Sequence, residues 1–280
     1  MNSKPKSEIL FRCSRLGDLV TGSEGLTQVQ SARMDELKYK QSSGKITDKQ
    51  LIELGSLLDK QGNIRSITKT TESYVKSVWL EKEFGYKEDV MTDEMLKGHI
   101  CEQDSLGLVK QVLGGEFRVK NTKRFRNEFI EGTPDIILKK QDVVEDVKTS
   151  YNLRTFTEAE LIKGYFWQGQ GYMWLTGKTK YRLMYCLVPT PEEIITEQKK
   201  RWYFKFNCDE SNPHYMEIAA QIEHNNNLIS KLPAENRIKI FEFEFESEKI
   251  ELLKAKILVS RQYYDTLTLP MAKMPVKEHD

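Results

Sequence analysis

The sequence has few cysteines and no long apolar run, and both absences exclude classes of protein. Its four cysteines, Cys13, Cys101, Cys186 and Cys208, lie far apart and form no C-x-x-C pair. This spacing argues against a zinc ribbon, an iron-sulfur cluster and a disulfide framework, so we expect reduced thiols in or near the core. No apolar stretch approaches the ~20 residues of a membrane helix, and the first ten residues lack the apolar core of a signal peptide. We therefore expect a soluble, cytoplasmic protein without membrane contact.

Net charge is also nearly absent, with 43 Lys and Arg against 42 Asp and Glu and a formal net charge of +1. The overall balance gives no reason to assign a nucleic-acid binder. Basic residues gather locally within 120–126, 139–140, 178–182 and 199–201. A groove lined by some of these runs could hold phosphates, although each run alone is typical of a solvated face. Nucleic-acid binding can therefore be inferred only from a specific site and not from the overall charge.

The expected elements alternate in a way that indicates an α/β fold. Helices are expected after Thr47, whose spacing to Gln50 fits a capping box, and at 72–84 and 92–113. Strands follow at 116–121, 134–139 and 142–149, then a helix at 158–175 and a strand at 181–188. The last part adds helices at 192–200, 214–228 and 247–264 and a strand at 238–245.

The length of 280 residues suits one large domain with insertions. We expect a single domain over 1–280. Within it, 23–94 is expected to be a helical insertion or lid, 95–190 the catalytic core, and 191–280 an extension of helices and a strand.

Two carboxylates and a lysine occupy positions typical of a metal-dependent phosphodiesterase. On a strand, Asp146 and Lys148 point to the same face, and a short turn allows a hairpin that brings Asp135 beside them. Paired carboxylates suit a hard divalent cation, while a lysine beside them can hold or deprotonate water or stabilise a phosphate. A bare D-x-K triplet is common by chance and would otherwise be a solvated strand face. Pro134 before Asp135 and the apolar strand between the two acids favour the site.

Two helices can add further groups. Gly98 and Glu102 are four residues apart, so one helical face would present Glu102 to the same metal site. On the helix at 158–175, Gln168 and Tyr172 are again one turn apart. Two glycines in that helix lower its propensity, which indicates close packing or substrate approach.

The ordered set G-x-x-x-E, P-D, D-x-K and Q-x-x-x-Y resembles the RecB-type branch of the PD-(D/E)xK nucleases. More narrowly, KGHICE, EGTPDIIL, EDVKTS and YFWQGQGYMWLTGKTK resemble successive motifs of the lambda-exonuclease and YqaJ-like viral recombinases, and RCSRLG resembles their opening segment. The resemblance covers 8–22 and about 95–190. It implies a restriction-endonuclease-like α/β core, a central mixed β-sheet flanked by helices, and hydrolysis of DNA with two Mg²⁺ or Mn²⁺ ions.

The resemblance also implies roles for individual residues. The catalytic set would be Glu102, Asp135, Asp146, Lys148 and Gln168. Metal ligands would be Glu102, Asp135, Asp146 and the carbonyl of Val147, while Lys148 would position the attacking water. The substrate-binding set would be Arg12, Ser14, Arg15, Thr133 and Tyr172, with Ser14 and Thr133 at a terminal 5′-phosphate. Asp146 stands where many family members have glutamate, and Thr133 where they have serine.

The resemblance implies a phage-type exonuclease that degrades linear duplex DNA from its 5′ ends and leaves a 3′ strand for a single-strand annealing protein. It would form a ring-shaped trimer and act in the host cytoplasm. Other readings stay open: a RecB-like repair or CRISPR-associated nuclease, a site-specific endonuclease, and a catalytically silent DNA-binding protein with the same fold.

Overall fold

The computed structural model describes residues 9–22, 26–62, 67–88, 91–114, 118–207 and 209–269. Contacts divide the chain into two compact units. One comprises Met1–Phe11, Asp18–Lys87 and Glu251–Asp280, and the other comprises Arg12–Gly17 and Glu88–Ile250. Every residue that the sequence assigns to the active site belongs to the second unit. The division into 23–94, 95–190 and 191–280 stays a prediction.

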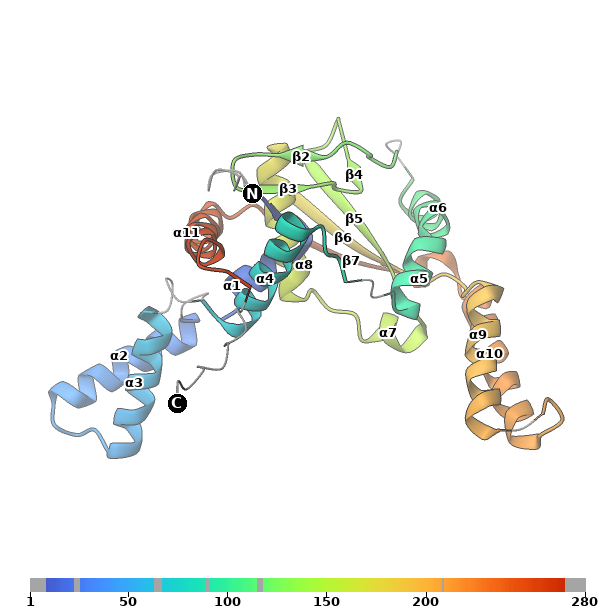
Figure 1. The fold of residues 1–280 in the computed structure, drawn as a ribbon, viewed down its shortest axis with the longest axis horizontal. Coiled ribbons are helices and arrows are strands. Elements are labelled where there is room, and N and C mark those ends of the chain that lie inside the picture. Colours follow the sequence, from blue (N-terminus) through green and yellow to red (C-terminus); the bar gives the residue numbers. More distant parts are fainter. Residues whose placement is uncertain are drawn as a thin grey trace, which may run out of the picture. The chain divides into compact units, whose positions relative to one another are not determined.

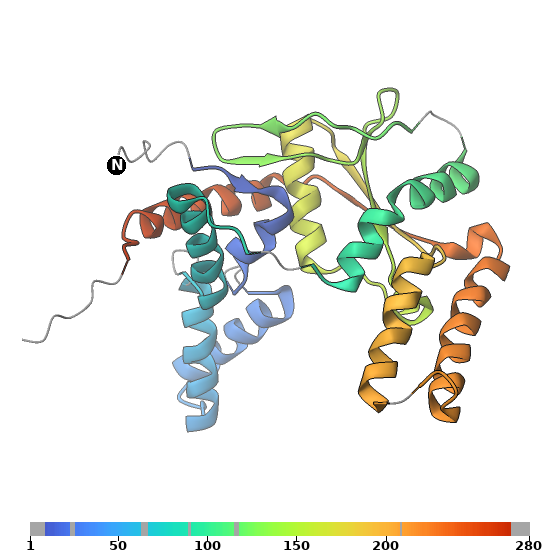
Figure 2. The ribbon, with the colours of Figure 1, turned by 45° about the vertical axis from the view of Figure 1, so that its right-hand side comes forward.

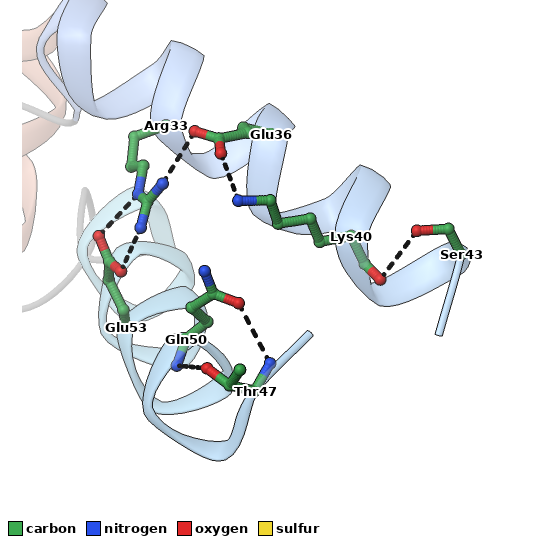
Figure 3. A network of polar contacts seen from close by, with 7 residues as sticks. All are labelled: Arg33, Glu36, Lys40, Ser43, Thr47, Gln50 and Glu53. Atoms are coloured by element: carbon green, nitrogen blue, oxygen red, sulfur yellow. Dashed lines mark hydrogen bonds and ion pairs between the residues drawn. The ribbon is translucent and has the colours of Figure 1, made fainter. Parts of the chain in front are cut away.

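The first unit is helical where it is described. Its helices are α2 (Gln28–Ser42), α3 (Asp48–Gly62), α4 (Lys69–Phe84) and most of α11 (Ser247–Tyr264), and α1 (Leu16–Val20) begins at its border. The expected capping box begins α3, since Gln50 N donates to Thr47 Oγ1 over 3.3 Å and Thr47 N donates to Gln50 Oε1 over 3.1 Å. Arg33 on α2 forms a bidentate salt bridge with Glu53 on α3 (Figure 3). This network joins the two helices.

A four-stranded mixed sheet forms the centre of the second unit (Figure 1). Its strands, in spatial order, are β4 (Ile136–Ile137), β5 (Val143–Thr149), β6 (Lys180–Cys186) and β7 (Ile238–Glu244). The pairs β4–β5 and β6–β7 are antiparallel, and β5–β6 is parallel. The predicted mixed sheet and the hairpin between the two acids are therefore confirmed.

Helices cover both faces of this sheet. On one face, Leu108 and Val109 of α6 (Glu102–Leu113) pack against Met184 and Cys186. On the other face lies α8 (Lys163–Thr176), which also contacts a smaller sheet (Figure 2). The smaller sheet has the order β1 (Phe11–Arg12), β3 (Ile130–Gly132), β2 (Phe125–Arg126).

Two glycines let α8 pack closely between the two sheets. A Cβ on Gly169 would lie 2.7 Å from Tyr181 Cδ1 of β6 and 2.5 Å from Phe243 Cζ of β7. A Cβ on Gly171 would lie 2.5 Å from Leu16 Cδ1 and 3.1 Å from Cys13 Sγ, beside the smaller sheet. Positions two apart on a helix point to nearly opposite sides. The expected close packing is therefore present on both sides of the helix.

The prediction of one long helix at 92–113 is wrong, because two helices cover this range. α5 (Asp93–Ile100) ends at Cys101, where φ is −89° and ψ is 10°, and α6 begins at Glu102. The buried Lys97 ties α5 down, since its Nζ donates over 2.8 Å to the carbonyls of Tyr151 and Val188, which follow β5 and β6. Gly98 and Glu102 therefore lie on different helices rather than on one face.

Other boundaries also differ from expectation. The strand predicted at 116–121 begins outside the described residues, and 118–121 forms no strand. The helix predicted at 158–175 begins later, after the short α7 (Leu153–Thr157). The three short strands of the smaller sheet were not predicted, because two or three residues give too little pattern. The helices α9 (Glu192–Phe206) and α10 (Pro213–Lys231) lie close to their predicted positions. Two short 3-10 helices, η2 (Cys13–Arg15) and η4 (Ala234–Arg237), were not predicted.

Three cysteines are buried free thiols, as expected: Cys13, Cys101 and Cys186. Cys208 lies outside the described residues. In the described part of the chain, no helix combines the length and apolar character needed to cross a membrane.

Candidate active site

Asp135, Asp146 and Lys148 meet at the edge of the mixed sheet. Asp135 directly precedes β4, and its Oδ2 accepts a hydrogen bond of 2.9 Å from Val147 N on β5. Lys148 Nζ lies 2.6 Å from Asp146 Oδ2, which is possible because both side chains leave the same face of β5. The hairpin and the two-residue spacing thus place the three groups as the sequence predicts.

The charges of these groups depend on one another. Burial and the neighbouring Asp146 raise the pKa of Asp135 to about 8, because two carboxylates in a dry site resist a second negative charge. Burial alone would lower the pKa of Lys148, but Asp146 and Asp135 outweigh it and raise that pKa above its ordinary value. Lys148 is therefore an ammonium group, suited to hold water or a phosphate oxygen rather than to accept a proton.

The acids fit a divalent cation. Asp146 Oδ2 is buried and makes no hydrogen bond, although Lys148 Nζ lies 2.6 Å from it. The N–H and C=O of one strand residue point to the same side, so the carbonyl of Val147 faces the Asp135 side of β5. Carboxylate and carbonyl oxygens are the ligands of hard cations, and Mg²⁺ is commonly bound by one or two carboxylates with water completing its shell. The donor set formed by Asp135, Asp146 and the Val147 carbonyl therefore suits Mg²⁺ or Mn²⁺.

Glu102 pairs with a lysine and not with these two acids. It is the first residue of α6, which covers the opposite face of the sheet, and its Oε2 lies 2.5 Å from Lys120 Nζ. Among the described residues, no three Asp, Glu, His or Cys side chains converge as a metal site. The structure thus joins two of the three expected carboxylates, and the metal-ligand role of Glu102 stays a prediction.

A chain of hydrogen bonds leads from α8 to the residue before Pro134. The buried Gln168 donates from Nε2 to Tyr172 Oη over 3.2 Å, and Tyr172 Oη donates to the carbonyl of Thr133 over 3.2 Å. Burial raises the pKa of Tyr172 above its ordinary value, and Asp146 raises it further. Gln168 and Tyr172 therefore lie beside the acids, and Tyr172 fixes the segment that carries Asp135.

The residues expected to bind a DNA end come from two neighbouring segments. Ser14 and Arg15 are exposed on η2, and Thr133 is exposed after β3. Their neighbours Cys13 and Gly132 pack together, since a Cβ on Gly132 would lie 2.9 Å from Cys13 Sγ. Arg12 is exposed at the start of η2. The structure brings the two segments side by side, and a phosphate pocket between them stays a prediction.

Several features near the site were missed from the sequence. Lys148 Nζ lies 5.2 Å from the centre of the Tyr165 ring, which packs edge-on against Tyr185. On the opposite face of β5, the buried Glu145 bonds to Arg118 and Arg182. The alternation along β5 could have placed Glu145 away from the site. Only the assembled sheet identifies its partners.

A cavity of about 800 Å³ lies away from these acids, between α9, α10 and the segment after β5. Its polar groups bond to one another: Arg201 to Asp93, Gln198 to Tyr151, and Asn226 to the backbone of Thr190. Its volume alone would favour this cavity as the functional site. These polar groups already have partners, whereas the acidic site has a buried carboxylate oxygen that makes no hydrogen bond.

The chain thus has a mixed sheet between helices, with P-D before one strand and D-x-K on the next. No family model and no curated protein matches the chain. Among solved structures, the chain is similar to a phage-related exonuclease from Haemophilus somnus 129PT, with a TM-score of 0.63, 22% identity, and coverage of 92% of this chain and 94% of that one. It is also similar to an alkaline exonuclease, LHK-Exo, from Laribacter hongkongensis, with a TM-score of 0.51, 10% identity, and coverage of 91% and 88%. The chain thus has the exonuclease fold that the motifs indicated.

Proposed function

We propose that this protein is a divalent-metal-dependent DNA exonuclease. The observation that carries the proposal is the pairing of the partly buried Asp135 with the buried Asp146 on one hairpin, where Lys148 Nζ lies 2.6 Å from Asp146 Oδ2. Two exonucleases share the fold that contains this hairpin. Acids whose pKa is shifted by burial and by a second acid cluster at functional sites, because the chemistry there needs groups that are costly to bury.

Each residue has a distinct task in this proposal. Asp135, Asp146 and the Val147 carbonyl would hold Mg²⁺ or Mn²⁺, most simply as two ions. Such ions neutralise the phosphate and lower the pKa of a bound water. Lys148 orients the attacking water and opposes the charge that develops on the phosphate. Gln168 and Tyr172 hold the Thr133–Asp135 segment in register with β5.

The family resemblance is the basis for the proposed substrate end, direction of degradation, partner and oligomeric state. The substrate would be the end of a linear duplex, degraded from 5′ to 3′, with Arg12, Ser14, Arg15 and Thr133 at the terminal phosphate. The product strand would pass to an annealing partner in phage-type recombination. The enzyme would act as a trimer in the host cytoplasm. Glu102 would join the metal ligands once its bond to Lys120 is released.

The test uses one DNA sequence in three forms: a linear duplex with open ends, the same duplex with covalently closed hairpin ends, and a circle. We expect the open duplex to be degraded with Mg²⁺ or Mn²⁺, both other forms to resist, and EDTA to abolish the reaction. Ca²⁺ should bind without supporting turnover. Full cleavage in EDTA would overturn the metal-dependent mechanism. Cutting of the circle at the rate of the open duplex would replace the exonuclease with an endonuclease.

A further inference from the structure

Two buried polar atoms beside the active site lack hydrogen-bond partners. One is Asp146 Oδ2, which forms an ion pair with Lys148 over 2.6 Å but makes no hydrogen bond, and the other is the hydroxyl of Tyr181. Both residues are almost completely buried. A buried hydroxyl without a partner destabilises the folded state, so each such atom calls for a physical explanation. The two atoms are chemically complementary, because a phenol can donate and a carboxylate accepts.

The register of the sheet places the two side chains on the same face. On the parallel pair β5–β6, Val144 is opposite Tyr181 and Asp146 is opposite Leu183. Residues 144 and 146 point to one face, so Tyr181 and Asp146 share it and lie one diagonal step apart. With strands about 4.8 Å apart and about 3.3 Å of rise per residue, that step is on the order of 8 Å between Cα atoms. A tyrosine side chain can span most of that distance.

Packing fixes the Tyr181 ring in this position. The ring lies under Gly169 of α8, where any Cβ would come within 2.7 Å of Cδ1, and its centre is 5.0 Å from that of Phe243. Burial raises the pKa of Tyr181 well above its ordinary value, and the Asp146 charge raises it further. The phenol therefore keeps its proton and has it available to donate.

Two other donors near Asp146, Tyr172 and Lys148, do not take the place of Tyr181 on the inner side of the site. The Tyr172 hydroxyl donates to the carbonyl of Thr133. Lys148 approaches Asp146 with a side chain that is 26% exposed, against 2% for Asp146, so it reaches from the open side. If Lys148 turns toward a phosphate or water, Asp146 loses that contact, and a fixed donor on the inner side must hold the carboxylate.

We propose that Tyr181 is a positioning residue that donates its hydroxyl hydrogen to Asp146 and orients that carboxylate toward a divalent cation. The proposal rests on the proposed function for the identity of the site. Groups that hold a metal ligand in place commonly change metal affinity or activity by about 10- to 100-fold when removed. Tyr181 would do so without touching the substrate.

The first experiment measures Mn²⁺ binding to the full chain by calorimetry, comparing wild type, Tyr181→Phe and the control Tyr215→Phe. Tyr215 is a partly buried tyrosine on α10 that packs against Tyr203, so its substitution also removes a hydroxyl. We expect Tyr181→Phe to weaken Mn²⁺ binding about tenfold and to lower kcat with little change in KM for DNA. Tyr215→Phe should match wild type. Wild-type Mn²⁺ affinity in folded Tyr181→Phe, or an equal loss in both variants, would overturn the proposal.

The second experiment needs no metal and no activity, and it keeps the Tyr181 ring in place. The ¹³Cζ resonance of Tyr181, assigned through its backbone, is compared in the metal-free wild type, in Asp146→Asn, and in Asp104→Asn as an exposed acidic control on α6. We expect it to move in Asp146→Asn alone. An unmoved resonance would overturn the contact. If the protein binds Mn²⁺ but cleaves no DNA, the proposed function fails, while these two readouts still decide the role of Tyr181.

Discussion

Individual residues in this site have properties set by burial and by their neighbours. Asp135 and Asp146 are aspartates in a dry environment, where a cation competes with the proton that Asp135 binds with a pKa of about 8. Lys148 keeps its charge because the same two acids surround it. The three side chains act as one electrostatic unit, so substituting any one of them changes the other two.

We predict that Asp135→Asn and Lys148→Ala each reduce the single-turnover cleavage rate by at least about a hundredfold, because these groups act on the reacting phosphate and water. DNA binding should largely survive, since long backbone contacts supply most of the affinity. Gln168→Ala should cost less, because it acts through Tyr172. Single-turnover assays and gel shifts on folded variants test this. Near-wild-type cleavage by Lys148→Ala would remove its assigned role.

Lys97 gives a pH prediction that is independent of the metal site. Burial lowers its pKa from 10.5 to about 8, so between those values the unfolded chain binds more protons than the folded chain. The contribution of Lys97 to the free energy of unfolding therefore rises with pH between about 8 and 10.5, and it is lost as the pH falls through about 8. In urea unfolding from pH 7.5 to 10, the stability of wild type relative to Lys97→Met should increase. A difference that stays constant with pH would contradict the buried charge.

At the scale of elements, α8 brings the two sheets together. It carries Gln168 toward the active site and Gln170 toward the end of β7, where Gln170 bonds to the carbonyl of Glu244 and the N–H of Glu246. Its glycines remove side chains where the sheets approach most closely. The unusual Q-x-Q segment with two glycines is thus explained by packing as much as by chemistry.

We predict opposite effects from two Gly→Ala substitutions within α8. Gly169→Ala should destabilise the protein by about 1 to 3 kcal/mol, because its Cβ would overlap Phe243 and Tyr181. Gly164→Ala meets no atom within 4 Å and should stabilise by up to about 1 kcal/mol through the unfolded state. Denaturant unfolding of both variants gives the comparison. Equal stability of the two would refute the packing of α8.

At the scale of the whole molecule, the site is assembled from segments far apart in the chain. Residues 12–17 join the unit that contains 88–250, and η2 packs against α8 and β3. The opening segment thus lies beside Thr133, although more than a hundred residues separate them. This placement gives the end-binding hypothesis its geometry.

We predict that a linear duplex with 5′-phosphates is degraded faster than one with 5′-hydroxyls. Ser14 and Thr133 can donate to a terminal phosphate, and Arg12 or Arg15 can add charge-assisted bonds that favour its second negative charge. Initial rates on the two duplexes, for wild type and for Arg12→Ala and Ser14→Ala, provide the measurement. If Ser14 only caps the turn, both variants will keep the wild-type ratio and the pocket is wrong.

The sequence by itself determined the features that depend on local spacing. The side-chain alternation of a strand placed Asp146 and Lys148 together, the short turn brought Asp135 beside them, and the capping box began α3. The motifs also indicated the fold that two exonucleases share. The contacts within the hairpin and the capping box join residues that are close in the chain, so the geometry of the local backbone fixes them.

Only the tertiary structure decided which distant groups meet. It ended α5 at Cys101, anchored Lys97 to two distant carbonyls, and paired Glu102 at the start of α6 with Lys120. It also placed Tyr181 on the same face of the sheet as Asp146. Such contacts depend on how layers stack and on which glycine lets them approach, and no periodicity in the sequence encodes the distance between two elements.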